Sequence, residues 1–414
     1  MIIIHIMTDR VLPRFLVRAV ERVARAMPVV VLTGARQTGK TTLVSQLLPG
    51  PRTYRTLDDL DVRALAERDP EELTEQPGRL VLDEVQRAPA LLLAVKRAID
   101  RDRRPGRYIL TGSANLLLMR SVSESLAGRA SYLTLWPMTR GERLGRGTAG
   151  AWSDLFEQDP ERWPDVLSSD EQRPADWREA ARRGGYPVPA VEQSSPEDRA
   201  IWFDGYVRTY LERDLQDLSA IGNLVDFRRL MVATCHRLGQ LVNQTELGRD
   251  VQLPQPTVRR WLNLLETSYQ LVRLPAYSVN RTKRLIKSPK LYWSDTGLAL
   301  RLAGLTRPGG AHLENLVLVD LLAWRDGAVL DRPEIFYWRT VNGEEVDLVV
   351  ERGSELIGIE VKATTRPRAS DAAHLRTFRD EYGGAVRGCL LLHTGDEITW
   401  LGPRILAAPW WRTI

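Results

Sequence analysis

The sequence predicts an α/β fold in which a parallel β-sheet carries a binding site at one edge. Residues 29–32 form a β-branched run with the composition of a buried strand. Apolar residues at helical spacing follow this run, at Leu43, Val44, Leu47 and Leu48. Further apolar runs alternate with helical segments as far as residue 135, which is typical of parallel strands joined by helices. Such a sheet binds its ligand at the carboxyl ends of the strands.

A glycine-containing loop, residues 33–42, lies between this strand and this helix. It matches G-x-x-x-x-G-K-[ST], the phosphate-binding P-loop. The glycines let the backbone curl so that successive N–H groups point at one centre, and the helix N-terminus adds partial positive charge. We expect Lys40 to reach the β- and γ-phosphates of a nucleotide, and the Thr41 hydroxyl to ligate Mg²⁺. The expected nucleotide contacts are Gly34, Ala35, Arg36, Gln37, Thr38, Gly39, Lys40, Thr41 and Thr42.

An acidic pair marks a second part of the same site. A strand predicted at residues 79–84 delivers Asp83 and Glu84 at its carboxyl end, which is the form of a Walker B strand. We expect Asp83 to hold Mg²⁺ and Glu84 to polarise the attacking water. An amphipathic helix is predicted before the sheet at residues 11–27, and a further strand at residues 53–57.

Two later positions are candidates for completing the nucleotide site. A strand predicted at residues 108–111 ends in a polar tip, where Ser113 is the preferred sensor of the γ-phosphate and Thr111 and Asn115 are the alternatives. Arg129 precedes a fifth strand, expected at residues 131–135, and is a candidate arginine finger for a neighbouring subunit. A solvated surface arginine is the other interpretation of Arg129.

Seven segments form an ordered set along the chain: GARQTGKTTL, LVLDEVQRAP, ILTGSANLLL, SLAGRA, LWPMTRGE, RRGGYPVP and YVRTYLERDLQDL. The set resembles a family of prokaryotic AAA-type ATPases that carry a C-terminal domain of unknown function. The resemblance implies binding and hydrolysis of ATP with Mg²⁺. It also favours a homo-oligomer such as a hexameric ring, in which Arg129, or Arg213 beside Asp214, faces the adjacent protomer. For Arg213 a helix-surface ion pair is the alternative.

The composition is that of a soluble globular protein with more than one domain. The chain has 414 residues, of which 43% are hydrophobic and 27% are charged. Cys235 and Cys389 lie far apart without CxxC spacing, which argues against a disulfide framework and against a zinc site. The apolar start, residues 1–7, is too short to span a bilayer and no other run approaches the required length. We therefore expect a cytoplasmic protein with no membrane partner.

Positive charge is concentrated in the middle of the chain. The net charge is +5, yet residues 228–290 hold 12 Lys or Arg against 3 Asp or Glu, so the remainder is net acidic. This concentration favours DNA as a partner, bound through its phosphates with little reading of sequence. The candidate DNA-binding residues are Arg259, Arg260, Arg281, Lys283, Arg284 and Lys287.

The same stretch has the pattern of a winged helix. A short helix opens at Asn243, a second helix is predicted at residues 257–266, and wing strands are predicted at residues 271–278 and 290–293. The second helix would enter the major groove. Winged helices also dock proteins or form lids, and this alternative stays open.

The last part of the chain carries an acidic pattern that resembles the PD-(D/E)xK nuclease core. Asp347 lies on one predicted strand, and Glu360 and Lys362 lie two apart on the next, so that both project from the same face. Glu314, on a helix predicted at residues 311–324, is a further candidate ligand. Together they form a possible second metal site, in which Lys362 would position water. Cleavage does not follow from the resemblance, since domains with this fold also bind DNA without cutting it.

These observations divide the chain into a P-loop ATPase core (1–145), an insertion and helical lid (146–225), a winged-helix region (226–305) and a small α/β restriction-endonuclease-like domain (306–414). The leading hypothesis is an AAA-type ATPase that binds DNA and acts on it, by processing branched or damaged DNA or by translocation. One alternative is a nucleotide-dependent signalling switch that recruits proteins. Another is an ATP-gated, metal-dependent nuclease.

Overall fold

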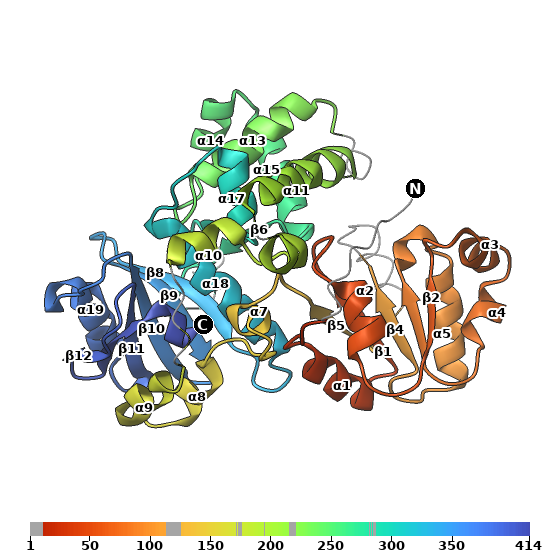
Figure 1. The fold of residues 1–414 in the computed structure, drawn as a ribbon, viewed down its shortest axis with the longest axis horizontal. Coiled ribbons are helices and arrows are strands. Elements are labelled where there is room, and N and C mark those ends of the chain that lie inside the picture. The colour runs from red at the N-terminus through yellow and green to blue at the C-terminus, as the bar shows by residue number, and fades with distance from the viewer. Residues whose placement is uncertain are drawn as a thin grey trace.

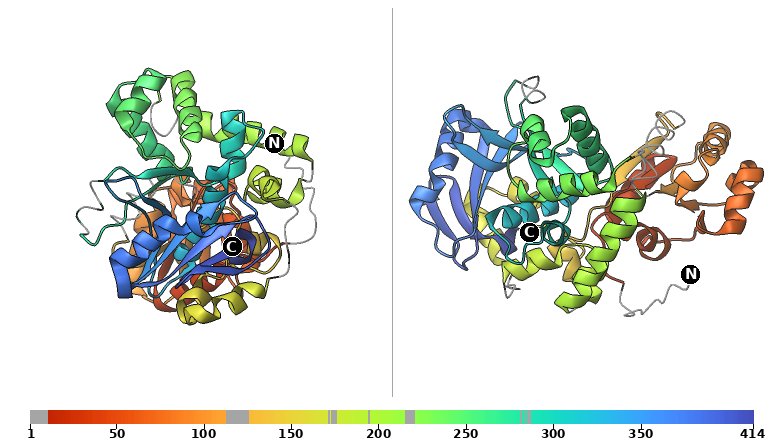
Figure 2. Two further views of the ribbon diagram at one scale, coloured as in Figure 1. Left: turned by 90° about the vertical axis from the view of Figure 1, so that its left-hand side faces the viewer. Right: turned by 90° about the horizontal axis from the view of Figure 1, so that it is seen from above.

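The chain has three parts (Figures 1 and 2). A parallel sheet with its helices lies at one end, a mixed sheet lies at the other, and a mainly helical part contacts both. The structure is a computed structural model, and it describes residues 11–112, 126–170, 172, 176–193, 195–210, 221–280, 282, 284 and 287–414, with the backbone alone for residues 211–214.

The first sheet has five strands, all parallel, in the order β2-β3-β4-β1-β5. The strands predicted from the sequence are confirmed to within one residue at each end. They are β1 (Val29–Thr33), β2 (Thr53–Thr56), β3 (Leu80–Asp83), β4 (Tyr108–Thr111) and β5 (Ala130–Thr134). Since β1 and β3 both flank β4, the P-loop and the acidic pair emerge at the same edge of the sheet.

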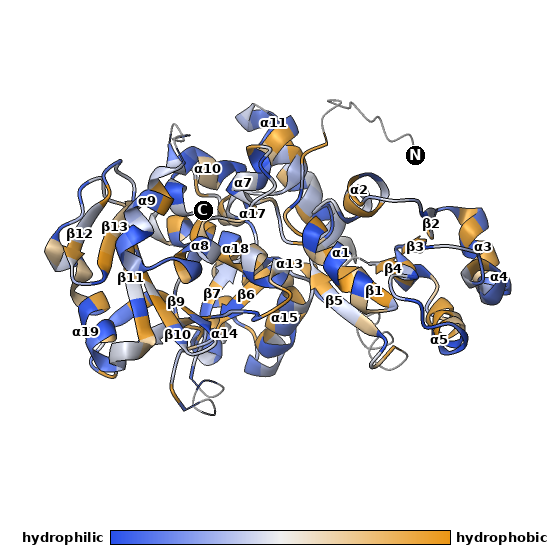
Figure 3. Cartoon of the chain, turned by 90° about the horizontal axis from the view of Figure 1, so that it is seen from below, coloured by the Kyte–Doolittle hydropathy of each residue, from blue (hydrophilic) through white to orange (hydrophobic). Residues whose placement is uncertain are grey.

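Helices cover both faces of this sheet because alternate strand residues point in opposite directions. Val29 and Val31 belong to one apolar core, whereas Val30 and Leu32 belong to another. In Figure 3, helices on both faces of the sheet carry apolar residues along one side of the helix and polar residues along the other. The first core is closed by α3 (Leu60–Arg68), α4 (Pro70–Thr74) and α5 (Leu91–Arg101), and the second by α1 (Val17–Ala26) and the P-loop helix, which is α2 (Lys40–Thr42) continued by the π-helix η1 (Leu43–Leu47).

The predicted helix at residues 11–27 is wrong in its first turns, since α1 starts only at Val17. Pro13 disfavours a helical conformation of the residue before it. Residues 11–14 have no regular secondary structure. The last of them, Arg14, has its side chain buried against the P-loop.

The middle part of the chain consists of helices and one short hairpin. Asn243 caps α14 by accepting the N–H groups of Thr245 and Glu246, as its position before the helix predicts. The second predicted helix is confirmed as α15, and β6 and β7 pair antiparallel. The elements are α10 (Trp177–Arg183), the π-helix η4 (Val188–Glu192), α11 (Pro196–Tyr206), the π-helix η5 (Val207–Asp214), α13 (Leu224–His236), α14 (Gln244–Val251), α15 (Gln255–Thr267), β6 (Leu271–Leu274), β7 (Lys290–Trp293) and α17 (Thr296–Ala303).

The last part is a six-stranded mixed sheet in the order β12-β13-β11-β10-β9-β8. β8, β9 and β10 pair antiparallel, and β11 lies parallel to β10. The long helix α18 packs on one face of the sheet and α19 on the other. The elements are α18 (Gly310–Gly327), β8 (Glu334–Arg339), β9 (Glu345–Arg352), β10 (Glu355–Lys362), α19 (Ala373–Tyr382), β11 (Val386–His393), β12 (Thr399–Gly402) and β13 (Ile405–Pro409).

The stretch expected to be an insertion, residues 145–169, forms two short helices beside the C-terminal sheet (Figure 1). They are α8 (Trp152–Glu157) and α9 (Trp163–Ser168). The Arg387 side chain donates to the Leu155 carbonyl oxygen at 3.2 Å, and the Trp163 ring lies so close to Gly388 that a Cβ there would approach it to 2.6 Å. These residues therefore help to cover a sheet that begins only at Glu334, far along the chain.

Candidate nucleotide site and acidic cluster

The P-loop has the backbone curl that its glycines predict. Gly34 has φ of 141° and Gly39 has φ of 94°, and a Cβ at Gly34 would lie 2.3 Å from the Leu135 carbonyl oxygen. The Lys40 side chain is buried, and its Nζ donates to the carbonyl oxygens of Gly34 at 3.0 Å and Ala35 at 2.7 Å. Burial lowers the pKa of Lys40 to about 8, against the opposing effect of the nearby Glu84 and Asp83 carboxylates.

Asp83 lies buried beside the P-loop, as its predicted role requires. Its carboxylate accepts hydrogen bonds from the Thr41 hydroxyl at 2.9 Å, from the Tyr54 hydroxyl at 2.7 Å and from the Thr111 hydroxyl. The structure thus brings together the two expected magnesium ligands, Thr41 and Asp83. Thr111 takes part in this site, while Ser113 and Asn115 lie outside the described residues. No motif marked Tyr54, which reaches the site because β2 is the neighbour of β3.

Glu84 stands in a conformation that non-glycine residues rarely adopt. Its φ is 58° and its ψ is 42°, which is the left-handed region. Such a backbone costs on the order of 1–3 kcal/mol and is concentrated at functional sites. The Gln86 side-chain amide donates to the Glu84 carboxylate, and the Glu84 backbone N–H donates to Thr111 Oγ1 at 3.4 Å. The carboxylate is therefore held at the carboxyl edge of the sheet by its own strand turn.

Arg14 supports the P-loop from the segment before α1. Its guanidinium donates to the carbonyl oxygens of Thr38 at 2.6 Å and Trp136 at 2.7 Å, and its Nε lies 3.0 Å from the Glu142 carboxylate. Glu142 lies in α7 (Arg140–Arg143) and also accepts the backbone N–H of Phe15 at 2.6 Å. The Arg14 and Glu142 side chains are both buried. No local pattern predicts this pair, because the two residues are far apart in the chain and belong to no motif.

The middle part of the chain contacts the P-loop domain through tyrosine hydroxyl groups. The Tyr269 hydroxyl lies 2.8 Å from Thr33 Oγ1, at the end of β1, and Tyr269 itself has φ of 57°. The Tyr206 hydroxyl donates to the Arg36 carbonyl oxygen at 3.4 Å and lies 3.0 Å from the Tyr186 hydroxyl. The P-loop is therefore in direct contact with helices that follow it by more than a hundred residues.

Of the two candidate arginine fingers, the structure describes the side chain of Arg129 but not that of Arg213. Arg129 lies at the amino-terminal edge of the sheet, next to the start of β5, where its Nε donates to Asp100 Oδ1 at 2.6 Å. The P-loop is at the opposite edge, so Arg129 does not act on the site of its own chain. The side chain of Arg213 lies outside the described residues.

Of the predicted DNA-binding residues, Arg259 and Arg260 are exposed on α15, and Lys287 is exposed as well. The two arginines belong to a groove of about 450 Å³ lined by Gln255, Pro256, Arg259, Arg260, Asn263, Leu264 and Thr267. Arg281 and Lys283 lie outside the described residues.

Arg284 was expected to contact DNA, but its side chain is buried and is not exposed to a DNA phosphate. Its guanidinium is buried, forms a two-pronged ion pair with Glu351 of β9, and lies over the rings of Tyr277 and Phe336. A side chain held this way anchors the segment after β6 to the C-terminal sheet.

Of the four residues of the predicted second metal site, Glu314 and Asp347 contact a lysine of the wing strand predicted at residues 290–293. Lys290 of β7 places its Nζ 3.3 Å from Glu314 Oε1, 2.5 Å from Glu345 Oε1 and 3.5 Å from Asp347 Oδ1. Lys362 pairs with Glu360 at 2.6 Å, as their alternation on β10 predicts. Burial and the neighbouring Asp347 carboxylate raise the pKa of both Glu314 and Glu360.

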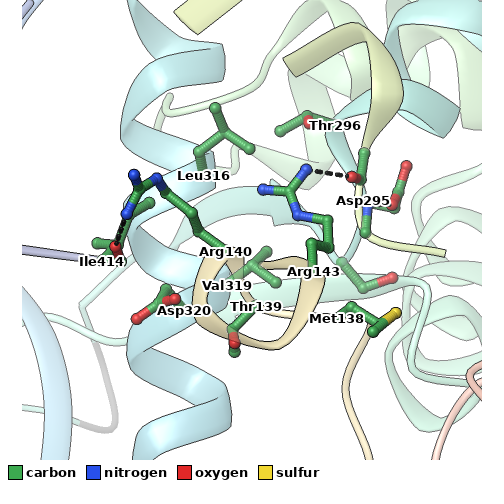
Figure 4. Close-up of a pocket in the computed structure, with 13 residues that line it drawn as sticks. Met138, Thr139, Arg140, Arg143, Asp295, Thr296, Leu316, Val319, Asp320 and Ile414 are labelled. Carbon is green, nitrogen blue, oxygen red and sulfur yellow. Dashed lines mark hydrogen bonds between the residues drawn. The ribbon is translucent and has the colours of Figure 1, made fainter. Parts of the chain in front are cut away.

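A small polar cavity lies where the three parts of the chain meet (Figure 4). Arg143 of α7 points toward Asp295, the N-cap of α17, whereas Arg140 of α7 donates to the Ile414 carbonyl oxygen, and Asp320 of α18 also lines the cavity. Burial raises the pKa of Asp320 to about 7 and lowers that of Arg143 to about 10. The cavity volume is about 20 Å³, room for a single water, so the cavity is a structural junction and not a ligand pocket.

Comparison with known proteins agrees with this geometry and decides the family. The model of an AAA domain matches residues 26–144, and two domains of unknown function, DUF8612 and DUF4143, match residues 174–309 and 309–412. The uncharacterized protein Rv2008c of Mycobacterium tuberculosis is 36% identical over 367 residues, which cover 85% of this chain and 75% of the relative. This chain belongs to the same family. The uncharacterized protein Mb2031c of Mycobacterium bovis matches this chain with the same identity and coverage as Rv2008c does.

The domain matches identify residues 26–144 as an AAA-type, nucleotide-binding P-loop domain and residues 309–412 as a C-terminal domain of unknown function. Among solved structures, the Walker-type ATPase PABY2304 of Pyrococcus abyssi is similar over 72% of this chain and 99% of that chain, with 16% identity and a TM-score of 0.44. Within the residues that the structure describes, no helix combines the length and the hydrophobicity needed to cross a bilayer.

Proposed function

We propose that this protein binds ATP with Mg²⁺ at the P-loop and hydrolyses it. The observation that carries the proposal is the convergence of three groups at the carboxyl edge of the parallel sheet. These are the buried Lys40 ammonium, the Thr41 hydroxyl 2.9 Å from the Asp83 carboxylate, and the carboxylate of Glu84. The match of the first domain to an AAA domain supports the same proposal.

The residues present fit a nucleotide and its metal. The N–H groups of the loop and the Lys40 ammonium would hold the phosphates, and the oxygen atoms of Thr41 and Asp83 are hard ligands of the kind Mg²⁺ prefers. The metal would neutralise charge on the phosphates. Glu84 is then the base that orients a water by accepting its hydrogen bond and takes its proton.

Replacing Lys40 with Ala is expected to weaken ATP binding by about 10- to 100-fold, because a hydrogen bond to a charged group contributes roughly 1.5–3 kcal/mol. Isothermal titration calorimetry with Mg²⁺ and a slowly hydrolysed ATP analogue measures the change. Lys96→Ala, at a partly exposed position of α5, is the control and should bind like the unmodified protein. No heat of binding with the unmodified, folded protein would contradict the proposal itself.

We further propose that the middle part of the chain contacts DNA as a winged helix. Support comes from α14 and α15 followed by the β6–β7 hairpin, which is the order of a winged helix, and from the two exposed arginines beside the groove on α15. Guanidinium groups at such positions bind phosphates and release counterions, with little dependence on sequence.

Replacing both Arg259 and Arg260 with Ala is expected to lower the affinity for duplex DNA by roughly 10- to 100-fold at low salt. It should also reduce the slope of log affinity against log salt concentration by about 2, since each arginine contributes about 1. Fluorescence anisotropy at several salt concentrations measures both quantities. The control removes two exposed arginines of α5, Arg97 and Arg101, and equal salt slopes in both variants would contradict the assignment.

Two further assignments stay proposals. The order α18, three antiparallel strands, α19 and a parallel strand, with Asp347 on β9 and Glu360 on β10, supports a restriction-endonuclease-like fold for the last domain. A homo-oligomer, in which Arg129 or Arg213 acts on the neighbouring subunit, is supported by the position of Arg129 away from its own P-loop. Sedimentation velocity with ATP and Mg²⁺ tests the assembly, which a monomer at every concentration would rule out.

A further inference from the structure

We propose that Lys290 takes the place of a divalent cation among the carboxylates of the C-terminal domain, so that this acidic cluster is held together without metal. The inference goes beyond ATP hydrolysis and DNA contact, and it does not depend on either of them. It concerns the residues for which the sequence predicted a second metal site: Glu314, Asp347, Glu360 and Lys362.

The first observation is the position of the lysine. Lys290 lies on β7, outside the C-terminal sheet, and only 2% of its side chain is exposed. Its ammonium reaches one carboxylate of α18, Glu314, and two of β9, Glu345 and Asp347, at distances from 2.5 to 3.5 Å. An ammonium has three N–H donors and no acceptor, so its hydrogen-bonding capacity matches three carboxylates.

The second observation is that several of the other carboxylate oxygen atoms already have partners. Asp347 Oδ2 accepts the Val361 backbone N–H at 2.9 Å, Glu314 Oε1 also accepts the Tyr292 hydroxyl, and Glu345 Oε2 lies 3.3 Å from Arg339. Glu360 Oε1 accepts a hydrogen bond from Lys362, and Glu360 Oε2 is buried without a hydrogen-bond partner among the described residues. Mg²⁺ requires near-octahedral oxygen ligands. Among the described residues, no three carboxylate, imidazole or thiolate side chains are grouped to hold a metal ion.

The third observation is the electrostatic need for a cation at this point. Only 12% of the Glu314 side chain and 16% of the Asp347 side chain are exposed, and a carboxylate shielded from water is costly unless a positive charge compensates it. Lys290 supplies that charge to both carboxylates from inside the fold, over the ring of Tyr337. The donor set therefore fits an ammonium better than a second, exchangeable cation. Since the chemistry of the PD-(D/E)xK pattern relies on a metal, we expect this domain not to cleave DNA by that route.

The test is metal binding by the full chain without nucleotide, with Mn²⁺ as the probe. Titration followed by electron paramagnetic resonance should show the same Mn²⁺ binding for the unmodified protein and for Asp347→Asn. Equal binding means that the acidic cluster holds no Mn²⁺. Mn²⁺ that is bound by the unmodified protein and lost in Asp347→Asn would overturn the proposal.

Removal of the lysine gives the complementary result. Lys290→Ala leaves the carboxylates uncompensated, and we expect its melting temperature to fall by roughly 6–20 °C. Mn²⁺ at millimolar concentration should restore part of this loss, and Lys290→Ala combined with Asp347→Asn should lose the restoration. A Lys290→Ala protein that folds and does not respond to Mn²⁺ overturns the proposal. If that variant fails to fold, the comparison of the unmodified protein with Asp347→Asn still decides the question.

Discussion

Glu84→Gln is expected to lower the rate of ATP turnover by roughly 10²–10⁴-fold and to leave ATP binding almost unchanged. Gln has nearly the shape of Glu but cannot take a proton from water at neutral pH. The backbone N–H bond to Thr111 Oγ1 does not involve the side chain, so the left-handed turn at Glu84 is retained. Steady-state phosphate release and calorimetric titration, measured on the same preparation, separate turnover from binding.

The control for this variant is Glu67→Gln, which removes an exposed carboxylate that pairs with Arg63 on the surface of α3. Exposed pairs at this spacing contribute a few tenths of a kcal/mol, so turnover should be unaffected. A Glu84→Gln protein with turnover within a few-fold of the unmodified protein would show that another group is the base.

Arg14→Met is expected to destabilise the P-loop domain by about 3–5 kcal/mol, because it leaves the buried Glu142 carboxylate without its cation. It also removes two donors to the carbonyl oxygens of Thr38 and Trp136. Urea unfolding followed by near-ultraviolet circular dichroism measures the loss. Arg18→Met, at an exposed position of α1, is the control and should be nearly neutral.

The same effect has a second, independent check. Combining Arg14→Met with Glu142→Gln removes the unpaired charge, so the double variant should be more stable than Arg14→Met alone. The residual loss then reports the hydrogen bonds to the P-loop backbone. A loss below about 1 kcal/mol in Arg14→Met would mean that solvent reaches Glu142 and that the pair does not brace the loop.

The sequence predicted the nucleotide edge well because local patterns determine it. The P-loop, the strands and the Asp83–Glu84 pair are each written in a few consecutive residues, and parallel strand order places their ends at one edge. The alternation of Glu360 and Lys362 on β10 follows from strand geometry in the same way.

The rest depended on contacts between distant parts of the chain, which no local pattern encodes. Arg14 meets Glu142, and Tyr269 meets Thr33, only because whole domains pack together. The neighbours of Lys290 in the sequence predict a wing strand, which is β7, but they do not predict that its ammonium belongs to the acidic cluster. The positive charge of Arg284 predicts a phosphate contact, whereas Glu351 neutralises this charge inside the fold.

The continuous apolar core that runs from α13 and α15 through α18 into the C-terminal sheet has a consequence for dissecting the molecule. Trp293 of β7 and Asn315 of α18 also exchange backbone-to-amide hydrogen bonds at 3.0 and 2.7 Å. The second and third parts should therefore melt in one cooperative transition, and a truncation near residue 305 would expose apolar surface and yield insoluble fragments. The two apolar clusters on the faces of the parallel sheet lie outside that core. The chain is therefore best divided close to residue 145.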